Sequence, residues 1–201
     1  MGIDCPLGWP NAFVSALTSY HGFKSWHGSE ADYDAFSYRL TDAVVRGETK
    51  GPWPLSVSAD KLGVVAFRCA RILSDIPGVD RTGATGPVAE VYPAAALRQW
   101  GLVSRESLKE HGSYKRSVPA LAALFDAFAA ALPLDISAIA DECRHDHDAF
   151  DALVCAVLAR AVDRKLTRAP TDEQREVAAA EGWIHFPPKT PLHDLAERLL
   201  A

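Results

Sequence analysis

The stretch Val88-Ala89-Glu90-Val91-Tyr92 is the strongest strand signal in the interior of the chain. It is short and partly β-branched, and Pro93 ends it. A second strand is expected over residues 1–5, where an apolar residue leads to Asp4 at the exit of the strand. A third, shorter strand is expected over residues 182–187. These segments predict a small mixed or parallel sheet.

Helix outweighs strand in the rest of the chain, because apolar residues recur there at helical spacing. The alanine-rich segment 118–132 places Leu121, Leu124, Phe125 and Phe128 on one inward-facing stripe. Further helices are expected at residues 11–19, 33–45, 59–74, 94–100, 135–143, 148–166 and near 171–181. Together these patterns predict a single α/β domain over residues 1–201, with a small sheet flanked by helices.

The composition is that of a globular protein, with 48% apolar and 23% charged residues among 201. No apolar stretch approaches the roughly 18 residues that a membrane span needs. The N-terminus lacks the features of a signal peptide, and the four cysteines form no CxxC pair. We therefore expect a cytoplasmic protein with reduced, buried thiols and no zinc site. The net charge of −5 argues mildly against a dedicated nucleic-acid binder, although metal-binding carboxylates also make a site acidic.

Four acidic residues stand out by their positions in the expected elements. Asp4 lies at a strand exit, and ligands bind at this rim in open α/β sheets. Glu90 is the single carboxylate of the interior strand. Asp148 and Asp151 are three residues apart, so they share a face in the first turn of the long helix. Carboxylates of this kind can converge on small, hard cations such as Mg²⁺.

Structural roles compete with a metal-binding role at these positions. Asp4 could cap a turn, and Asp148 could be an ordinary N-cap. Glu90 is harder to explain as solvated surface, because lone buried carboxylates are rare. The run Arg144-His145-Asp146-His147 is more typical of a solvated polar turn than of a metal cluster.

Two basic residues are candidates for contacts with a substrate. Lys115 follows Tyr114 in a polar stretch, where it could contact phosphate or be a solvated loop lysine. Arg39 precedes Asp42 by three residues on an expected helix, so the two could form a weak surface ion pair.

The ordered set of motifs resembles domain of unknown function family 429, a family predicted to be RNase H-like nucleases. The resemblance runs through most of the chain. It rests on the Ile3-to-Pro10 opening and on Tyr38-Arg39-Leu40-Thr41-Asp42, Glu90-Val91-Tyr92-Pro93, Ser113-Tyr114-Lys115 and the segment 148–153.

This resemblance implies an RNase H-like fold and hydrolysis of phosphodiester bonds with two Mg²⁺ or Mn²⁺ ions. Asp4, Glu90, Asp148 and Asp151 would be the metal ligands and the catalytic residues. Lys115 and Arg39 would contact the nucleic acid.

The resemblance also implies a strand that has no counterpart in this sequence. Proteins of this fold begin with a central strand that carries the first metal-binding Asp, followed by a hairpin. We therefore expect an N-terminally incomplete domain. If the chain is complete as given, the strand over residues 1–5 would have an unpaired edge, which favours self-association. Two alternatives remain: a catalytically degenerate binding or assembly module, and a phosphate- or nucleotide-binding enzyme on the same fold.

Overall fold

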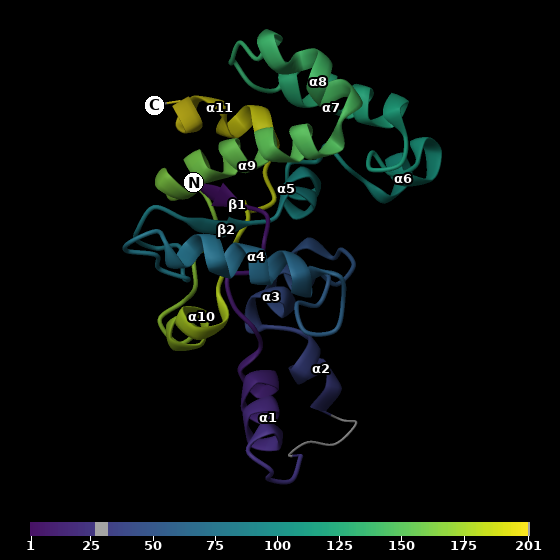
Figure 1. The fold of residues 1–201 in the computed structure, drawn as a ribbon. Coiled ribbons are helices and arrows are strands. Elements are labelled where there is room, and N and C mark those ends of the chain that lie inside the picture. Colours follow the sequence, from purple (N-terminus) through teal and green to yellow (C-terminus); the bar gives the residue numbers. More distant parts are fainter. Residues whose placement is uncertain (27–31, 201) are drawn as a thin grey trace. The chain divides into compact units, whose positions relative to one another are not determined.

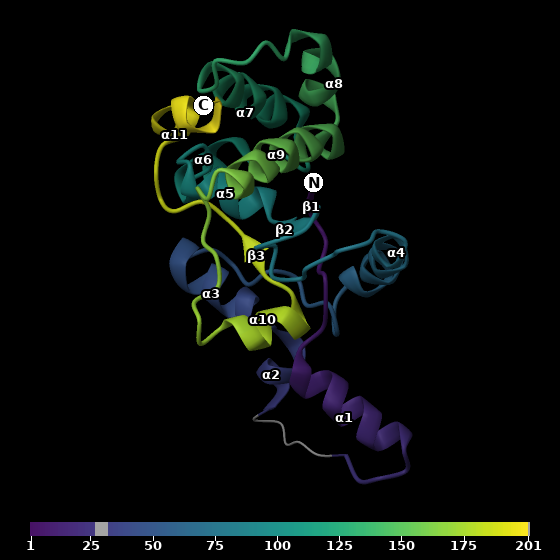
Figure 2. The same ribbon diagram turned by 90° about the vertical axis from the view of Figure 1, so that its left-hand side faces the viewer.

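Three short strands form one parallel sheet in the computed structural model, which describes residues 1–26 and 32–200 (Figure 1; all three strands are labelled in Figure 2). The strands are β1 (Gly2–Ile3), β2 (Ala89–Val91) and β3 (Ile184–His185), in the order β1-β2-β3. Ile3 is paired with Glu90, which is paired in turn with Ile184. The expectation of a small mixed or parallel sheet is confirmed, with all pairs parallel among the described strands, and each strand lies where the sequence predicts one.

The chain forms two compact units, which are described separately below. Unit 1 comprises Met1–Val91 and Ala169–His185 and contains the whole sheet, while unit 2 comprises Tyr92–Arg168 and Phe186–Ala201. The single-domain organisation and the RNase H-like topology therefore stay predictions.

In unit 1, helices lie on both sides of the sheet. Figure 2 shows α4 (Leu62–Ser74) on one side and α3 (Leu40–Thr49) on the other. Ala66 and Cys69 of α4 are buried against β1 and its exit, where Cys5 and Leu7 belong to the same core cluster. The remaining helices of this unit are α1 (Asn11–His21), α2 (Tyr33–Ser37) and α10 (Arg175–Glu181).

The helix expected over residues 33–45 is broken at Tyr38 and Arg39, and that prediction is wrong. Both residues have extended backbones. Tyr38 stacks on Trp53 with ring centroids 4.1 Å apart, and Arg39 is drawn into a buried ion network described below. These tertiary contacts override a local pattern that favours one continuous helix.

Unit 2 is a helical assembly around an aromatic core. Phe125, Phe128 and Phe150 pack edge to face, with centroid separations of 5.5 and 6.2 Å. The expected inward-facing stripe of helix α7 is buried as predicted. The helices of this unit are α5 (Pro93–Gln99), α6 (Arg105–His111), α7 (Val118–Ala130), α8 (Ala140–His145), α9 (His147–Asp163) and α11 (Leu192–Leu200).

Two global expectations can be compared with the structure. None of the helices in the described part of the chain is long and apolar enough to cross a membrane. All four cysteines are buried and free of disulfide bonds, as the sequence predicts.

Candidate functional site

The carboxylate of Glu90 lies at the centre of a buried ion network in unit 1. Its two oxygens accept hydrogen bonds from Arg39 Nη2 and Nη1, at 2.7 and 2.8 Å. Oε2 also accepts the Leu7 backbone N–H at 2.9 Å. Burial raises the pKa of the Glu90 carboxyl, against the opposing effect of the Arg39 charge and hydrogen bonds.

Arg39 has every one of its donors engaged. Its Nε and Nη2 bind Asp42, its two Nη groups bind Glu90, and Nη1 also reaches the Glu181 carbonyl at 3.3 Å. These contacts match the five N–H donors of a guanidinium. The side chains of Arg39 and Asp42 are only 2% and 1% exposed, so the expectation of a surface ion pair is wrong. Arg39 is the N-cap residue of α3, and folding of the network buries the pair.

Glu181 has a role that the sequence did not indicate. Its carboxylate accepts the N–H of Asn11 at 2.7 Å and the N–H of Leu40 at 2.8 Å. These are the first residues of α1 and α3, so a single carboxylate caps two helix N-termini. Gly182 follows with a φ of +88°, and a Cβ there would lie 3.0 Å from Glu90 Oε2. No local signal could have found this arrangement, because its partners are more than 140 residues apart in the chain.

Asp4 lies directly after β1 and is exposed. The register pairs Ile3 with Glu90, so Asp4 follows β1 one residue beyond that pair. The position at a strand exit is as predicted. Asp4 and Glu90 differ sharply in environment, because one carboxylate faces solvent while the other is engaged in the buried network.

In unit 2, Asp151 is held by the two residues that the sequence placed in a polar stretch. Its Oδ1 accepts the Tyr114 hydroxyl at 2.9 Å, and its Oδ2 lies 2.8 Å from Lys115 Nζ. Asp151 is 7% exposed, whereas the Lys115 side chain is 44% exposed. Lys115 is therefore an ion-pair partner rather than a freely solvated loop lysine. The sequence predicts a contact role for Lys115 but none for Tyr114, although the two share the motif Ser113-Tyr114-Lys115.

The N-terminus of α9 carries a second acidic cluster. Asp146 is the N-cap, and its Oδ1 accepts the backbone N–H groups of Asp148 and Ala149 at 2.8 and 3.4 Å. The suggestion that Asp148 could be the N-cap is therefore wrong, because the helix begins at His147 and its N-cap lies two residues before Asp148. The His147 Nδ1 atom lies 3.0 Å from Asp148 Oδ1.

Asp146, His147 and Asp148 could together hold a metal ion. Their ligand atoms all lie within 4.8 Å of one another. This group includes Asp146 and His147, two residues of the run that is expected from the sequence to be a solvated polar turn. The other two residues of that run face different partners: Arg144 pairs with Asp126 at 2.8 Å, and His145 contacts the Asp141 carbonyl.

The four predicted metal ligands are thus divided between the units. Asp4 and Glu90 belong to unit 1, and Asp148 and Asp151 belong to unit 2. Within unit 2, Asp148 and Asp151 occupy the first two turns of the same helix. The full set of four as one centre stays a prediction.

The model of the family described as "Protein of unknown function (DUF429)" matches residues 1–175, and the chain belongs to this family. The matched range contains each of the predicted ligands, together with Arg39 and Lys115. No curated protein and no solved structure matched the sequence.

Proposed function

We propose that the protein is a metal-dependent RNase H-like nuclease that hydrolyses phosphodiester bonds. The observation that carries this proposal is the gathering of ligand groups at the start of α9. Asp146, His147 and Asp148 have ligand atoms within 4.8 Å of one another, and Asp151 lies on the next turn of the helix. The carboxylates of this cluster could bind a cation, and the neighbouring Lys115 could bind the phosphate of a substrate.

The donor chemistry fits Mg²⁺ or Mn²⁺. Carboxylate oxygens are the ligands that these hard cations prefer. When bound, such ions would activate water and stabilise the charge on the leaving oxygen. Asp148 and Asp151 are the proposed ligands in unit 2, and Asp4 and Glu90 are proposed separately as ligands in unit 1.

Tyr114 and Lys115 would orient the Asp151 carboxylate for metal binding. The Tyr114 hydroxyl fixes one oxygen of Asp151, and the Lys115 ammonium group balances its charge. Lys115 is partly exposed, so its ammonium group can also meet an anionic nucleic-acid backbone. The proposed partner is therefore a nucleic acid.

A second candidate function is a catalytically degenerate binding or assembly module on the same fold. The observation that favours it is the Arg39–Glu90 pair. Glu90 Oε2 already accepts two hydrogen bonds and Oε1 accepts one, so little lone-pair capacity remains for a metal. Arg39 likewise has no donor left for a phosphate.

Metal titration and cleavage assays separate the two candidates. Mn²⁺ and Mg²⁺ binding would be measured by calorimetry on the full chain and on Asp148→Asn and Asp151→Asn. Asp172→Asn is the matched control, because it removes an exposed carboxylate of unit 1. Cleavage of labelled single- and double-stranded DNA and RNA would be followed with each metal and with EDTA.

Nuclease activity predicts metal-dependent cleavage that Asp151→Asn lowers by about a hundredfold or more, while Asp172→Asn leaves it unchanged. If the wild-type protein cleaves none of the substrates, or if Asp148→Asn and Asp151→Asn bind metal as the wild type does, the nuclease proposal is wrong. Metal-independent nucleic-acid binding without cleavage would support the second candidate. Circular dichroism would show that each variant is folded.

We further propose self-association and a cytoplasmic location. In the described part of the chain β1 pairs only with β2, so its other edge offers backbone groups to a second copy. Light scattering after gel filtration tests for a homo-oligomer. The four free, buried cysteines support a reducing compartment.

A further inference from the structure

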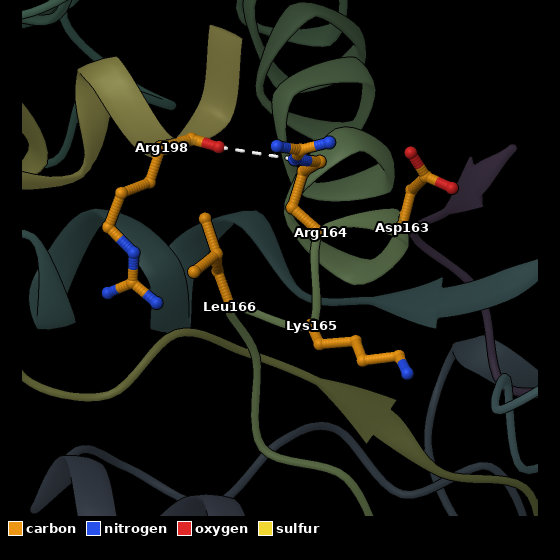
Figure 3. Close-up of a pocket in the computed structure, with 5 residues that line it drawn as sticks. All are labelled: Asp163, Arg164, Lys165, Leu166 and Arg198. Atoms are coloured by element: carbon orange, nitrogen blue, oxygen red, sulfur yellow. Dashed lines mark hydrogen bonds between the residues drawn. The ribbon is translucent and has the colours of Figure 1, made fainter. Parts of the chain in front are cut away.

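A basic pocket lies at the C-terminal end of α9, at the opposite end of the helix from Asp148 and Asp151. Its volume is about 310 Å³, and Figure 3 shows Leu166 between the basic side chains. All of its residues belong to unit 2. They are Asp163, Arg164, Lys165, Leu166 and Arg198.

The chain adopts an unusual conformation to place one of these cations. Lys165 has a φ of +56°, in the left-handed region where glycine is the usual residue after a helix. The Lys165 and Leu166 N–H groups bind the Val162 and Ala161 carbonyls at 2.9 and 2.8 Å. This is the hydrogen-bond pattern of a Schellman motif. A lysine in this conformation costs about 1 kcal/mol relative to glycine.

Arg160 of α9 and Arg164, which directly follows this helix, donate hydrogen bonds to carbonyls near the end of α11. Arg160 Nε donates to the Leu199 carbonyl at 2.9 Å, and Arg164 Nε donates to the Arg198 carbonyl at 3.3 Å (Figure 3). Arg160 also pairs with Asp163 at 2.7 Å. The charge of Asp163 is therefore already balanced by Arg160 and does not balance the other cations.

The positive charge of the pocket residues is larger than the partial negative charge at the nearby helix C-termini. The C-terminal ends of α9 and α11 together present about one negative charge. Among the described residues, no carboxylate pairs with Arg164, Lys165 or Arg198, which carry three positive charges. Within the described residues, about two positive charges thus face neither a carboxylate nor a helix end, in a protein whose net charge is −5. A dianion would supply the missing charge.

We propose that this pocket binds a phosphate dianion, either free or as the terminal phosphomonoester of a larger molecule. A phosphomonoester carries about 1.5 to 2 negative charges at neutral pH and has three strong acceptor oxygens. Guanidinium groups bind such oxygens in pairs, and the lysine adds a point charge. The proposal does not depend on the nuclease function, because it rests on a different end of α9.

Calorimetry and phosphorus NMR with inorganic phosphate test the proposal on the full chain at physiological salt. Binding is expected with a Kd on the order of 1 mM. Arg198→Gln and Arg164→Gln should each weaken it about tenfold, the effect of losing one charge-assisted contact. Arg68→Gln is the matched control, because it removes an exposed cation of α4 in unit 1, and it should leave the affinity unchanged.

Lys165→Gly separates binding from folding. Glycine suits the left-handed conformation, so this variant should unfold at a higher temperature while it binds phosphate more weakly. Absence of saturable binding up to roughly 20 mM phosphate overturns the proposal. Equal losses in Arg198→Gln and Arg68→Gln overturn it as well, because they indicate diffuse charge rather than a site.

A second arm identifies the source of the phosphate. Oligonucleotides with a 5′-phosphate and with a 5′-hydroxyl would be compared. A preference for the phosphorylated end that Arg198→Gln abolishes assigns the pocket to nucleic-acid termini. Binding of inorganic phosphate with no such preference assigns it to small phosphorylated molecules.

Discussion

The guanidinium of Arg39 donates to both carboxylate oxygens of Glu90, at 2.7 and 2.8 Å, in a part of unit 1 that excludes water. Asp42 shares the same guanidinium, so two buried carboxylates depend on a single cation. Because Glu90 belongs to the middle strand, the network ties the sheet to the start of α3. The loss of unfolding free energy when this network is disrupted therefore measures how much the network stabilises unit 1.

Replacing Arg39 with methionine should destabilise the fold severely. The change leaves Glu90 and Asp42 buried without a counter-charge, which costs about 3–5 kcal/mol of unfolding free energy. Equilibrium unfolding in urea measures the loss. Arg175→Met is the control, because Arg175 pairs with Asp172 on the surface, and its loss should cost less than about 1 kcal/mol. Equal losses in the two variants would contradict a structural role for the network.

Acid should weaken the fold through His185. Burial lowers the pKa of this imidazole, although its hydrogen bond to the Thr82 carbonyl opposes the effect. The folded protein therefore resists protonation more than the unfolded chain, whose histidine titrates at about pH 6.5. The contribution of neutral His185 to stability is complete above that pH. It is lost as the pH falls toward and through the lowered pKa of His185 in the folded protein.

Urea unfolding at about pH 7.5 and about pH 5.5 brackets the unfolded histidine pKa and measures this pH dependence. The wild type should lose more stability on acidification than His185→Gln, because the glutamine does not titrate. An unchanged pH dependence in His185→Gln would assign the effect to other groups.

Alanine substitution should have opposite effects at two glycines. A Cβ on Gly8 would lie 2.7 Å from the Ala180 carbonyl oxygen, so Gly8→Ala must displace backbone and should cost about 1–3 kcal/mol. Gly47 lies within α3 with nothing within 4 Å of its Cβ position. Gly47→Ala should therefore stabilise by up to about 1 kcal/mol. Thermal unfolding measures the stability of both variants. Stabilisation by Gly8→Ala would contradict a close approach of residue 8 to the Ala180 carbonyl.

Removal of the Tyr114 hydroxyl should loosen Asp151. Tyr114→Phe leaves one buried carboxylate oxygen without its donor, which should cost about 1–2 kcal/mol of unfolding free energy. Tyr20→Phe is the control, because the side chain of Tyr20 is 63% exposed and its loss of a hydroxyl should be neutral. Urea unfolding compares the two. Equal stability of both variants would show that Lys115 alone fixes Asp151.

The sequence predicts those features that depend on neighbouring residues. The strand at Val88–Tyr92 and the apolar stripe of α7 are local patterns, and both are found where expected. The position of Asp4 at a strand exit follows from the same kind of pattern. The spacing of apolar residues along the chain predicts which segments form helices or strands and which of their faces are buried.

The features that could not be predicted from the sequence depend on contacts between distant residues or on the residue at which a helix begins. The break at Arg39 exists because Glu90, fifty-one residues away, draws the guanidinium inward. Glu181 caps α1 and α3 from the far end of the chain. The N-cap of α9 is Asp146 rather than Asp148, since a small shift of a helix start changes the capping residue.

The order of the strands along the chain has a consequence for biosynthesis. β1 and β2 are made early, but β3 emerges from the ribosome only after nearly all of unit 2 has been synthesised. At usual elongation rates, that interval is on the order of ten seconds. During it, Glu90 and Arg39 are present while Glu181 and the third strand are not. Helices α5 to α9 of unit 2 are therefore synthesised before the residues that complete unit 1, and only α11 follows them.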